Sequence, residues 1–180
     1  MKLIKGCLIT LILFIVSCTI GWLFLENNIT GNLASLQQNV ENNWGIYVTN
    51  LEERNAEFSQ EIKDDSLNYY IESSKRIINS KDYLTELELN EYKFNKTAMA
   101  NSFVSNLNAK LNSCLDNYNQ SVREYNIYRI KFPNSIIARR MNFRKSYKYF
   151  DIRYGIENEK VMARKKEREN WVKNGGEYPN

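Results

Sequence analysis

The chain has 180 residues, 43% of them hydrophobic, and a formal net charge of +4, which leaves room for one modest domain besides an anchoring segment. It contains no histidine and three cysteines, so a His-based triad, a thiolate–imidazole pair and a Cys/His zinc site are excluded. Only seven glycines and two prolines occur. These are too few for a chain of tight β-turns, and they favour long helices.

The N-terminal segment Leu3–Leu25 is apolar except for Lys5. A helix of this length reaches about 34 Å, which is enough to cross the hydrocarbon core of a bilayer. Lys2 and Lys5 flank its start, and no Lys or Arg follows it until Arg54. The positive-inside bias therefore predicts a single-pass protein with a cytoplasmic N-terminus and residues 26–180 outside the cytoplasm.

Two alternatives to an uncleaved transmembrane span stay open for this segment. A cleaved signal peptide requires small residues at its cut site, but the run continues through the bulky Trp22 and Phe24. Ile15–Cys18 loosely fits a lipobox, and Cys18 would then carry a lipid. Because the residues after Thr19 remain apolar, we favour an uncleaved span over a lipoprotein anchored at Cys18.

Residues 32–63 are predicted to form the first helix of the body, with apolar side chains at steps of three, four or seven. The stretch 67–78 keeps a looser helical pattern, and residues 79–96 suit a short helix or a turn region. The apolar positions of the first helix are Leu33, Leu36, Val40, Trp44, Tyr47, Leu51, Phe58 and Ile62.

The pattern is clearest over residues 99–132, which predict one unbroken helix that Pro133 stops. Asn134-Ser135 offers a cap for a following helix up to Phe150, and Gly155 offers a stop for it. Residues 156–171 predict a further helix. The apolar positions of the unbroken stretch are Met99, Phe103, Leu107, Leu111, Cys114, Tyr118, Val122, Tyr125, Tyr128 and Phe132.

Apolar stripes on helices this long must be buried against one another. We therefore expect an all-α fold, in which a transmembrane helix continues into an antiparallel bundle of three or four long helices. The predicted organisation is an anchor (1–27), a helical bundle (28–152) and a basic, partly helical or disordered tail (153–180).

Two Tyr-Asn pairs, Tyr118-Asn119 and Tyr125-Asn126, stand seven residues apart with Val122 between them. This order resembles the signature of the LemA family of bacterial membrane proteins, which continues with Phe-Pro, an Ala, a Phe and Tyr-Phe. An upstream V-x-x-x-W segment and one of the family's paired arginines have counterparts too. The remaining matching positions are Val40, Trp44, Arg54, Phe132, Pro133, Ala138, Phe143, Tyr149 and Phe150.

The match is that of a divergent member of the family. The resemblance implies a helical bundle on an anchor in the bacterial cytoplasmic membrane, with no established catalytic activity and no cofactor. We interpret the motif positions as structural: the tyrosines pack between helices, and Asn119 and Asn126 bond a facing helix or its carbonyl groups. A Tyr/Asn-lined recognition groove is the alternative.

Residues 133–180 carry 12 basic and 6 acidic side chains, which favours a solvated basic face or contact with anionic lipid. Nucleic acid is excluded by the predicted orientation.

We expect no catalytic residue, metal site or cofactor. The favoured function is a non-enzymatic interaction or scaffold protein that binds an unidentified envelope or membrane protein. The alternatives are a coiled-coil tether of a phage or cell envelope and, less favoured, an enzyme. The sequence leaves the oligomeric state open.

Overall fold

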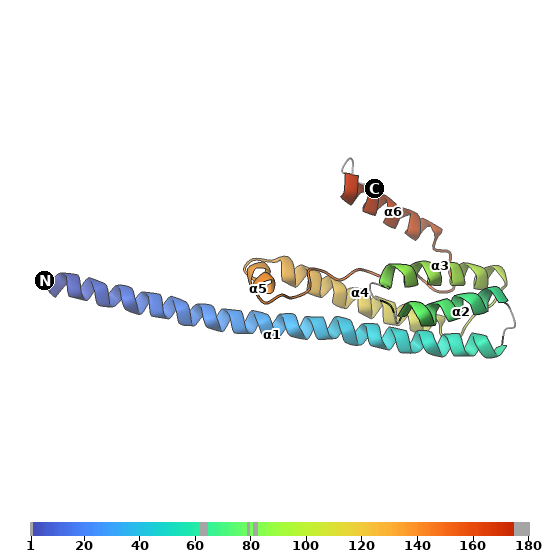
Figure 1. Cartoon of the computed structure of the whole chain (residues 1–180), viewed down its shortest axis with the longest axis horizontal. Coiled ribbons are helices and arrows are strands. Elements are labelled where there is room, and N and C mark those ends of the chain that lie inside the picture. Colours follow the sequence, from blue (N-terminus) through green and yellow to red (C-terminus); the bar gives the residue numbers. More distant parts are fainter. Residues whose placement is uncertain (1, 62–64, 79, 81–82, 175–180) are drawn as a thin grey trace. The chain divides into compact units, whose positions relative to one another are not determined.

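A computed structural model describes residues 2–61, 65–78, 80 and 83–174 of the chain (Figure 1). Within these residues the fold is all-α without strands, as the sequence predicted. Residues 62–63 of the predicted first body helix and the glycines at 175 and 176 lie outside the described residues. The six helices are α1 (Lys2–Glu61), α2 (Asp65–Ile78), α3 (Leu84–Ala100), α4 (Asn108–Ile130), α5 (Asn134–Arg140) and α6 (Glu159–Asn174).

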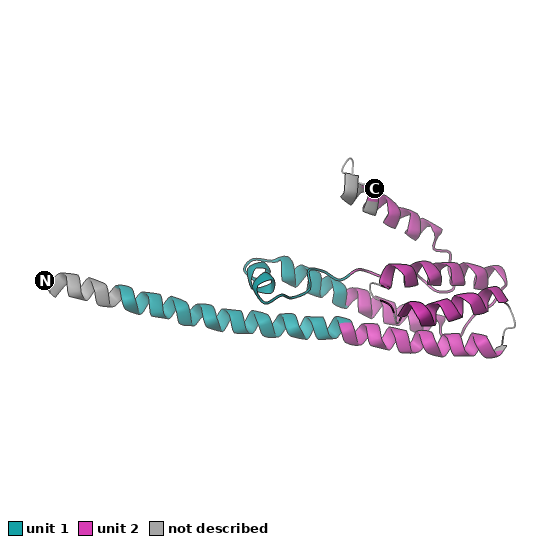
Figure 2. Cartoon of the chain, viewed as in Figure 1, with its two compact units in different colours: residues 1–40, 121–147 teal, residues 41–120, 148–180 magenta. Residues whose placement is uncertain are grey.

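The chain divides into two compact units (Figure 2). Unit 1 contains residues 1–40 and 121–147, and unit 2 contains residues 41–120 and 148–180. Unit 1 thus holds the N-terminal part of α1, the last turns of α4 and all of α5. Unit 2 holds the remainder of α1 and α4 together with α2, α3 and α6.

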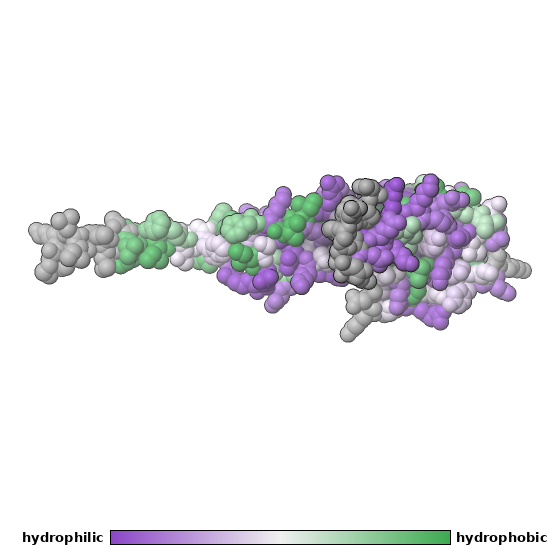
Figure 3. Space-filling model, turned by 90° about the horizontal axis from the view of Figure 1, so that it is seen from above, coloured by the Kyte–Doolittle hydropathy of each residue, from purple (hydrophilic) through white to green (hydrophobic). Residues whose placement is uncertain are grey.

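Within unit 1, every residue from Leu11 to Leu25 is exposed, and the exposed side chains include Phe14 at 68% and Phe24 at 75%. This stretch forms part of the apolar, green surface of α1 in Figure 3. By length and composition, α1 is a helix that could cross a membrane. It is the one such helix in the part of the chain that the structure describes.

The surface of α1 changes character directly after this stretch. Glu26 is nearly buried and accepts a hydrogen bond from the guanidinium of Arg140 in α5. Farther along, Ile29 and Leu33 are buried at a helical spacing. Their positions belong to the core of unit 1, whose other buried apolar residues are Val40, Val122, Tyr125, Ile137, Ala138 and Tyr147.

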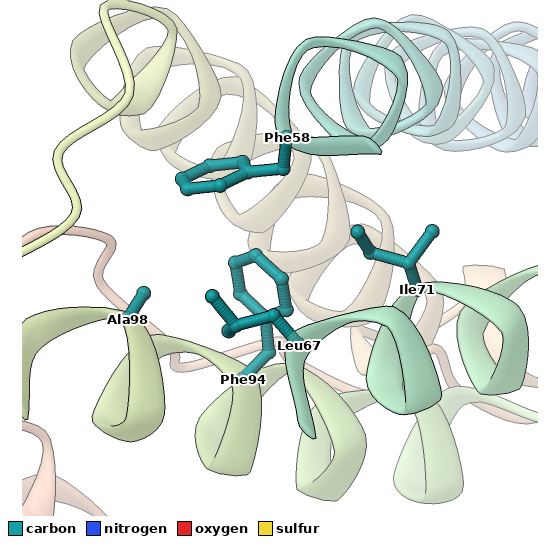
Figure 4. Close-up of a cluster of buried hydrophobic side chains, with 5 residues drawn as sticks. All are labelled: Phe58, Leu67, Ile71, Phe94 and Ala98. Atoms are coloured by element: carbon teal, nitrogen blue, oxygen red, sulfur yellow. The ribbon is translucent and has the colours of Figure 1, made fainter. Parts of the chain in front are cut away.

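A hydrophobic cluster in unit 2 joins α1, α2 and α3 (Figure 4). The rings of Phe58 and Phe94 meet edge to face, with their centroids 5.3 Å apart. Leu67 and Ile71, four residues apart, project from α2 into the same cluster, and Ala98 adds a second residue from α3. Burial of each large side chain contributes about 1.5–3 kcal/mol, so this cluster stabilises the packing of the three helices.

The prediction of one unbroken helix over residues 99–132 is wrong. Helix α3 ends at Ala100, because Ser102 adopts a positive φ of 58°. The amide of Phe103 then donates to the carbonyl of Ala98, and the amide of Ser102 to that of Met99. This is the Schellman arrangement, which terminates a helix while satisfying its last carbonyls, and here it forms without glycine.

The prediction of a helix from 134 to 150 is also wrong. Helix α5 ends at Arg140 in a second Schellman arrangement, with Asn142 at φ 56° and the amide of Phe143 bonded to Ala138. Asn134 makes no capping bond to α5, and its side chain donates instead to the carbonyl of Tyr128 at 2.8 Å. Residues 143–155 form neither helix nor strand, and we call them the non-helical segment.

Candidate functional site

Asn126 of the sequence motif binds the main chain of the non-helical segment within unit 1. Its Nδ2 donates to the carbonyl of Tyr147, and its Oδ1 accepts from the amide of the same residue, both at 2.9 Å. The neighbouring Tyr125 is buried and donates its hydroxyl to the carbonyl of Arg144 at 2.6 Å. Both members of this Tyr-Asn pair therefore hold the same stretch of backbone.

The same arrangement occurs within unit 2. Asn119 donates to the carbonyl of Phe150 at 2.8 Å and accepts from its amide at 2.9 Å, and Tyr118 donates to the carbonyl of Lys148 at 2.9 Å. Asn112, seven residues before Asn119, makes the equivalent pair of bonds with Tyr154, at 3.1 and 2.8 Å. We call Asn112, Asn119 and Asn126 the asparagine ladder.

Two further asparagines bind the backbone at the end of the non-helical segment. Asn95 of α3 accepts from the amide of Gly155 and donates to the carbonyl of Ile156, both at 2.8 Å. Asn158 accepts from the amide of Arg153 and donates to its carbonyl at 2.7 Å. Gly155 has φ +78°, a conformation that favours glycine, and a Cβ there would meet Nδ2 of Asn108 at 3.2 Å.

A primary amide offers one donor and one acceptor side by side, as a peptide unit does. Each asparagine of the ladder therefore acts as a single residue of a neighbouring β-strand, exchanging two hydrogen bonds with one residue opposite. Buried backbone groups must find partners, and here α4 supplies them without a sheet. The carbonyls that the Tyr-Asn pairs bind thus belong to a non-helical segment, whereas the sequence predicted helix there.

The other motif positions are dispersed between buried and exposed surroundings. Trp44 is half-buried and donates its Nε1 hydrogen to the hydroxyl of Tyr83 at 2.6 Å. Its ring lies 4.9 Å from that of Tyr118 and 5.5 Å from that of Phe150, centroid to centroid. Phe132, by contrast, is 81% exposed. Of the rest, Val40, Arg54, Val122 and Ala138 are buried, Pro133 and Phe143 half-buried, and Tyr149 exposed.

Unit 2 buries a complete ion pair that sequence reasoning did not find. Nη1 of Arg54 lies 2.8 Å from Oε2 of Glu91, and both side chains are 0% exposed. Glu91 also accepts from the hydroxyl of Ser74 at 2.5 Å and from that of Tyr154 at 3.1 Å. The guanidinium lies over the ring of Phe94, 3.9 Å from its centroid.

Two buried phenols adjoin this ion pair. The hydroxyls of Tyr47 and Tyr154 are 2.6 Å apart. Burial, and after it the negative charge of Glu91, raises the pKa of each phenol well above 10.0. Burial by itself would lower the pKa of Arg54, but Glu91 and the phenols outweigh it and the pKa is raised. Arg54 therefore stays charged and the two phenols stay neutral at neutral pH.

A second acidic residue of α3 fastens α6. Glu88, nearly buried, accepts from the amide of Asp151 at 2.7 Å and from the ammonium of Lys165 at 2.6 Å. Lys165 also lies 3.2 Å from the carboxylate of Asp151. Lys165 of α6 therefore makes specific contacts with the rest of unit 2, and Tyr154 and Asn158 are buried within this unit.

These polar groups of unit 2 bind one another. Among residues 2–61, 65–78, 80 and 83–174, no three His, Cys, Asp or Glu side chains lie together in a group that could hold a metal ion. Burial, partly opposed by the charge of Lys110, raises the pKa of the Cys114 thiol, which makes it a weak nucleophile. Cys18, the position considered for lipidation, is exposed on the apolar stretch of α1.

Comparison with protein-family models, with curated proteins and with solved structures finds no match to this chain. Fold and site therefore define it by class alone. It is an all-α protein with one long apolar N-terminal helix, whose polar body is held together by side chains that bind backbone.

Removal of one amide of the ladder should destabilise the fold without touching an exposed surface. We expect Asn119→Ala to lower the free energy of unfolding by about 1–3 kcal/mol, because it leaves an amide and a carbonyl of Phe150 unpaired. The exposed Asn117 of the same helix provides a matched control, and Asn117→Ala should change stability by less than about 0.5 kcal/mol. Urea unfolding followed by circular dichroism in detergent measures both. Equal losses would contradict this role.

Breaking the buried ion pair should cost more. Arg54→Leu leaves the Glu91 side chain buried without its cation, so we expect a loss of about 3–5 kcal/mol, most of which the double variant Arg54→Leu, Glu91→Leu recovers. Lys110 and Glu53 form an exposed pair, and Lys110→Leu should cost at most about 1 kcal/mol. A double-mutant cycle by urea unfolding gives the coupling energy; no recovery in the double variant would argue against the pair.

Proposed function

We propose that this protein is a membrane-tethered helical interaction protein that binds a protein partner in the cell envelope and has no enzymatic activity. The observation that carries the proposal is the change along α1. From Leu11 to Leu25 the helix exposes apolar residues on every face, whereas the part of α1 that follows buries six large apolar residues, which are Ile29, Leu33, Val40, Tyr47, Leu51 and Phe58. A helix that is apolar all round suits hydrocarbon, where its backbone is satisfied internally.

We further propose that the span lies in a bacterial cytoplasmic membrane, with Lys2 and Lys5 on the cytoplasmic side and residues 26–180 outside. Lipid attachment at Cys18 is the alternative form of anchoring. The resemblance of the motif to the LemA family supports both the bacterial setting and the interaction role. Anionic lipid is a further proposed contact of the basic C-terminal third.

An interaction role also agrees with how the polar groups of the body are used. The buried carboxylates of Glu88 and Glu91 are paired with cations of the same chain, and the Tyr-Asn pairs are occupied by the non-helical segment. A substrate would have to displace these contacts. A protein partner, in contrast, needs only the exposed surface of the helices.

A structural tether between two envelope layers is the second candidate. The observation that favours it is the uninterrupted course of α1 over 60 residues, which is long for a helix of a globular domain. Small-angle scattering of the protein in a detergent-matched buffer distinguishes the two candidates: a rod favours the tether, and a compact particle favours the interaction protein.

The anchor can be tested with a matched pair of substitutions. Ile15 and Ile46 are 54% and 53% exposed on α1, but only Ile15 lies in the apolar stretch. We expect Ile15→Arg to weaken membrane retention, because an arginine near the middle of a span costs about 2.5–3.5 kcal/mol. Ile46→Arg should leave it unchanged. Sodium carbonate extraction of membranes measures retention, and a wild-type chain released by carbonate would refute the anchor.

The partner can be sought in native membranes with a lysine-reactive crosslinker on the full-length chain. We expect an adduct that contains a second, different polypeptide, and we expect Asn126→Ala to leave its yield unchanged if the variant stays folded, because this amide faces its own chain. An adduct of this chain with itself alone would argue against a distinct protein partner. Loss of the adduct in a folded Asn126→Ala protein would restore the recognition groove.

A further inference from the structure

Unit 1 exposes a group of apolar side chains where α4 gives way to α5. Ile130 and Phe132 are 68% and 81% exposed, and Ile136 and Met141 are 50% and 46% exposed. We call these four residues the α4–α5 corner. Large apolar side chains that a folded protein leaves exposed close together in the sequence suit a contact with a partner or a membrane.

Two contacts within unit 1 fix the level of this corner along α1. Arg140, the last residue of α5, pairs with Glu26, and Asn32 donates to the hydroxyl of Tyr128 at 3.1 Å. Glu26 and Asn32 lie one and seven residues beyond Leu25, which corresponds to a rise of about 1.5–10 Å along the helix. In Figure 2, α5 accordingly lies beside α1 where the unaccompanied part of the helix ends.

A bilayer crossed by the apolar stretch would begin its headgroup layer at this same level. That layer is about 5–8 Å thick on each side of the hydrocarbon core. Aromatic and aliphatic side chains that reach it bury apolar surface at little cost, as interfacial amphipathic segments do. The position of the corner therefore matches a membrane surface.

The charges around the corner favour an anionic surface. Residues 127–147 contain no Asp or Glu, and their basic residues are Arg129, Lys131, Arg139, Arg140, Arg144 and Lys145. Lys131, Arg139, Arg144 and Lys145 are exposed. Basic side chains next to a span attract anionic lipid headgroups, whereas a second copy of this surface would be repelled by like charge.

We propose that the α4–α5 corner is a second membrane contact, which inserts Phe132 and its apolar neighbours into the anionic interface beside α1. This inference rests on the proposed function only in requiring that α1 crosses a membrane. It goes beyond a general attraction of the basic C-terminal third, because it assigns the contact to four apolar residues and the cations beside them.

The test uses the full-length chain with its native cysteines replaced by alanine and one new cysteine labelled with an environment-sensitive fluorophore. The three positions are Phe24→Cys in the apolar stretch, Phe132→Cys at the corner and Ser35→Cys, an exposed position of α1 beyond it. Each protein is placed in phosphatidylcholine vesicles, with or without phosphatidylglycerol, that contain a nitroxide-labelled lipid. We expect quenching at Phe132 to exceed that at Ser35 by about two-fold or more, and to increase with phosphatidylglycerol.

The charged neighbours give a matched pair of variants. Lys131→Glu with Arg139→Glu should reduce quenching at Phe132 toward the level of Ser35, while Arg123→Glu, an exposed position of α4 outside the corner, should not. Quenching at Phe24 without quenching at Phe132 would overturn the corner contact and leave the anchor standing, whereas absence of quenching at Phe24 would overturn the anchor itself. A Phe132 probe shielded from aqueous iodide but not quenched by lipid would indicate a protein contact and overturn the inference.

Discussion

The buried carboxylate of Glu91 is the constraint on which the packing of unit 2 depends. An ionised group cannot be withdrawn from water without partners, since its desolvation costs several kcal/mol. Here the partners come from three different segments: Arg54 of α1, Ser74 of α2 and Tyr154 of the non-helical segment. Displacement of α1 would leave the carboxylate without its cation, and displacement of either other segment would remove one of its hydrogen bonds. The pair therefore contributes less to net stability than to the choice of one arrangement among many.

The asparagine ladder likewise supplies hydrogen-bond partners, in this case to neutral groups of the backbone. Non-helical backbone packed against a helix ordinarily leaves amides and carbonyls unpaired, which is why connecting segments stay at the surface. Asn119 and Asn126 remove that penalty, so Phe150 and Tyr147 can be buried among aromatic side chains. Charged and neutral polar contacts thus act together: Tyr154 is held by Asn112 through its backbone and by Glu91 through its hydroxyl.

Hydrophobic periodicity was sufficient to predict the fold class and the helix at 67–78, because both depend on which face of a helix is apolar. The apolar part of α1 was predicted from an unbroken run of apolar residues. Periodicity failed where helices end without a conventional signal. Ser102 and Asn142 take positive φ angles that sequence spacing does not indicate. It also failed after Arg140, since the chain there leaves the helix and then buries every second residue at Phe150, Ile152 and Tyr154. The sequence signals that could have predicted this non-helical segment were the apolar period of two and the asparagines seven residues apart in α4. The ion pair gave none, because Arg54 and Glu91 are 37 residues apart in sequence.

The asparagine ladder binds main-chain atoms, so it depends on the number of residues between its attachment points and not on the identity of their side chains. Asn112 and Asn119 are two helical turns apart, a rise of about 10.5 Å, while the four residues from Phe150 to Tyr154 reach at most about 14 Å. The intervening chain therefore exceeds this rise by only about one residue's reach. Deletion of a single residue between the two attachment points would use up that reserve and turn the following side chains to the opposite face. The spacing of the asparagines on α4 therefore sets how many residues the non-helical segment needs between its attachment points.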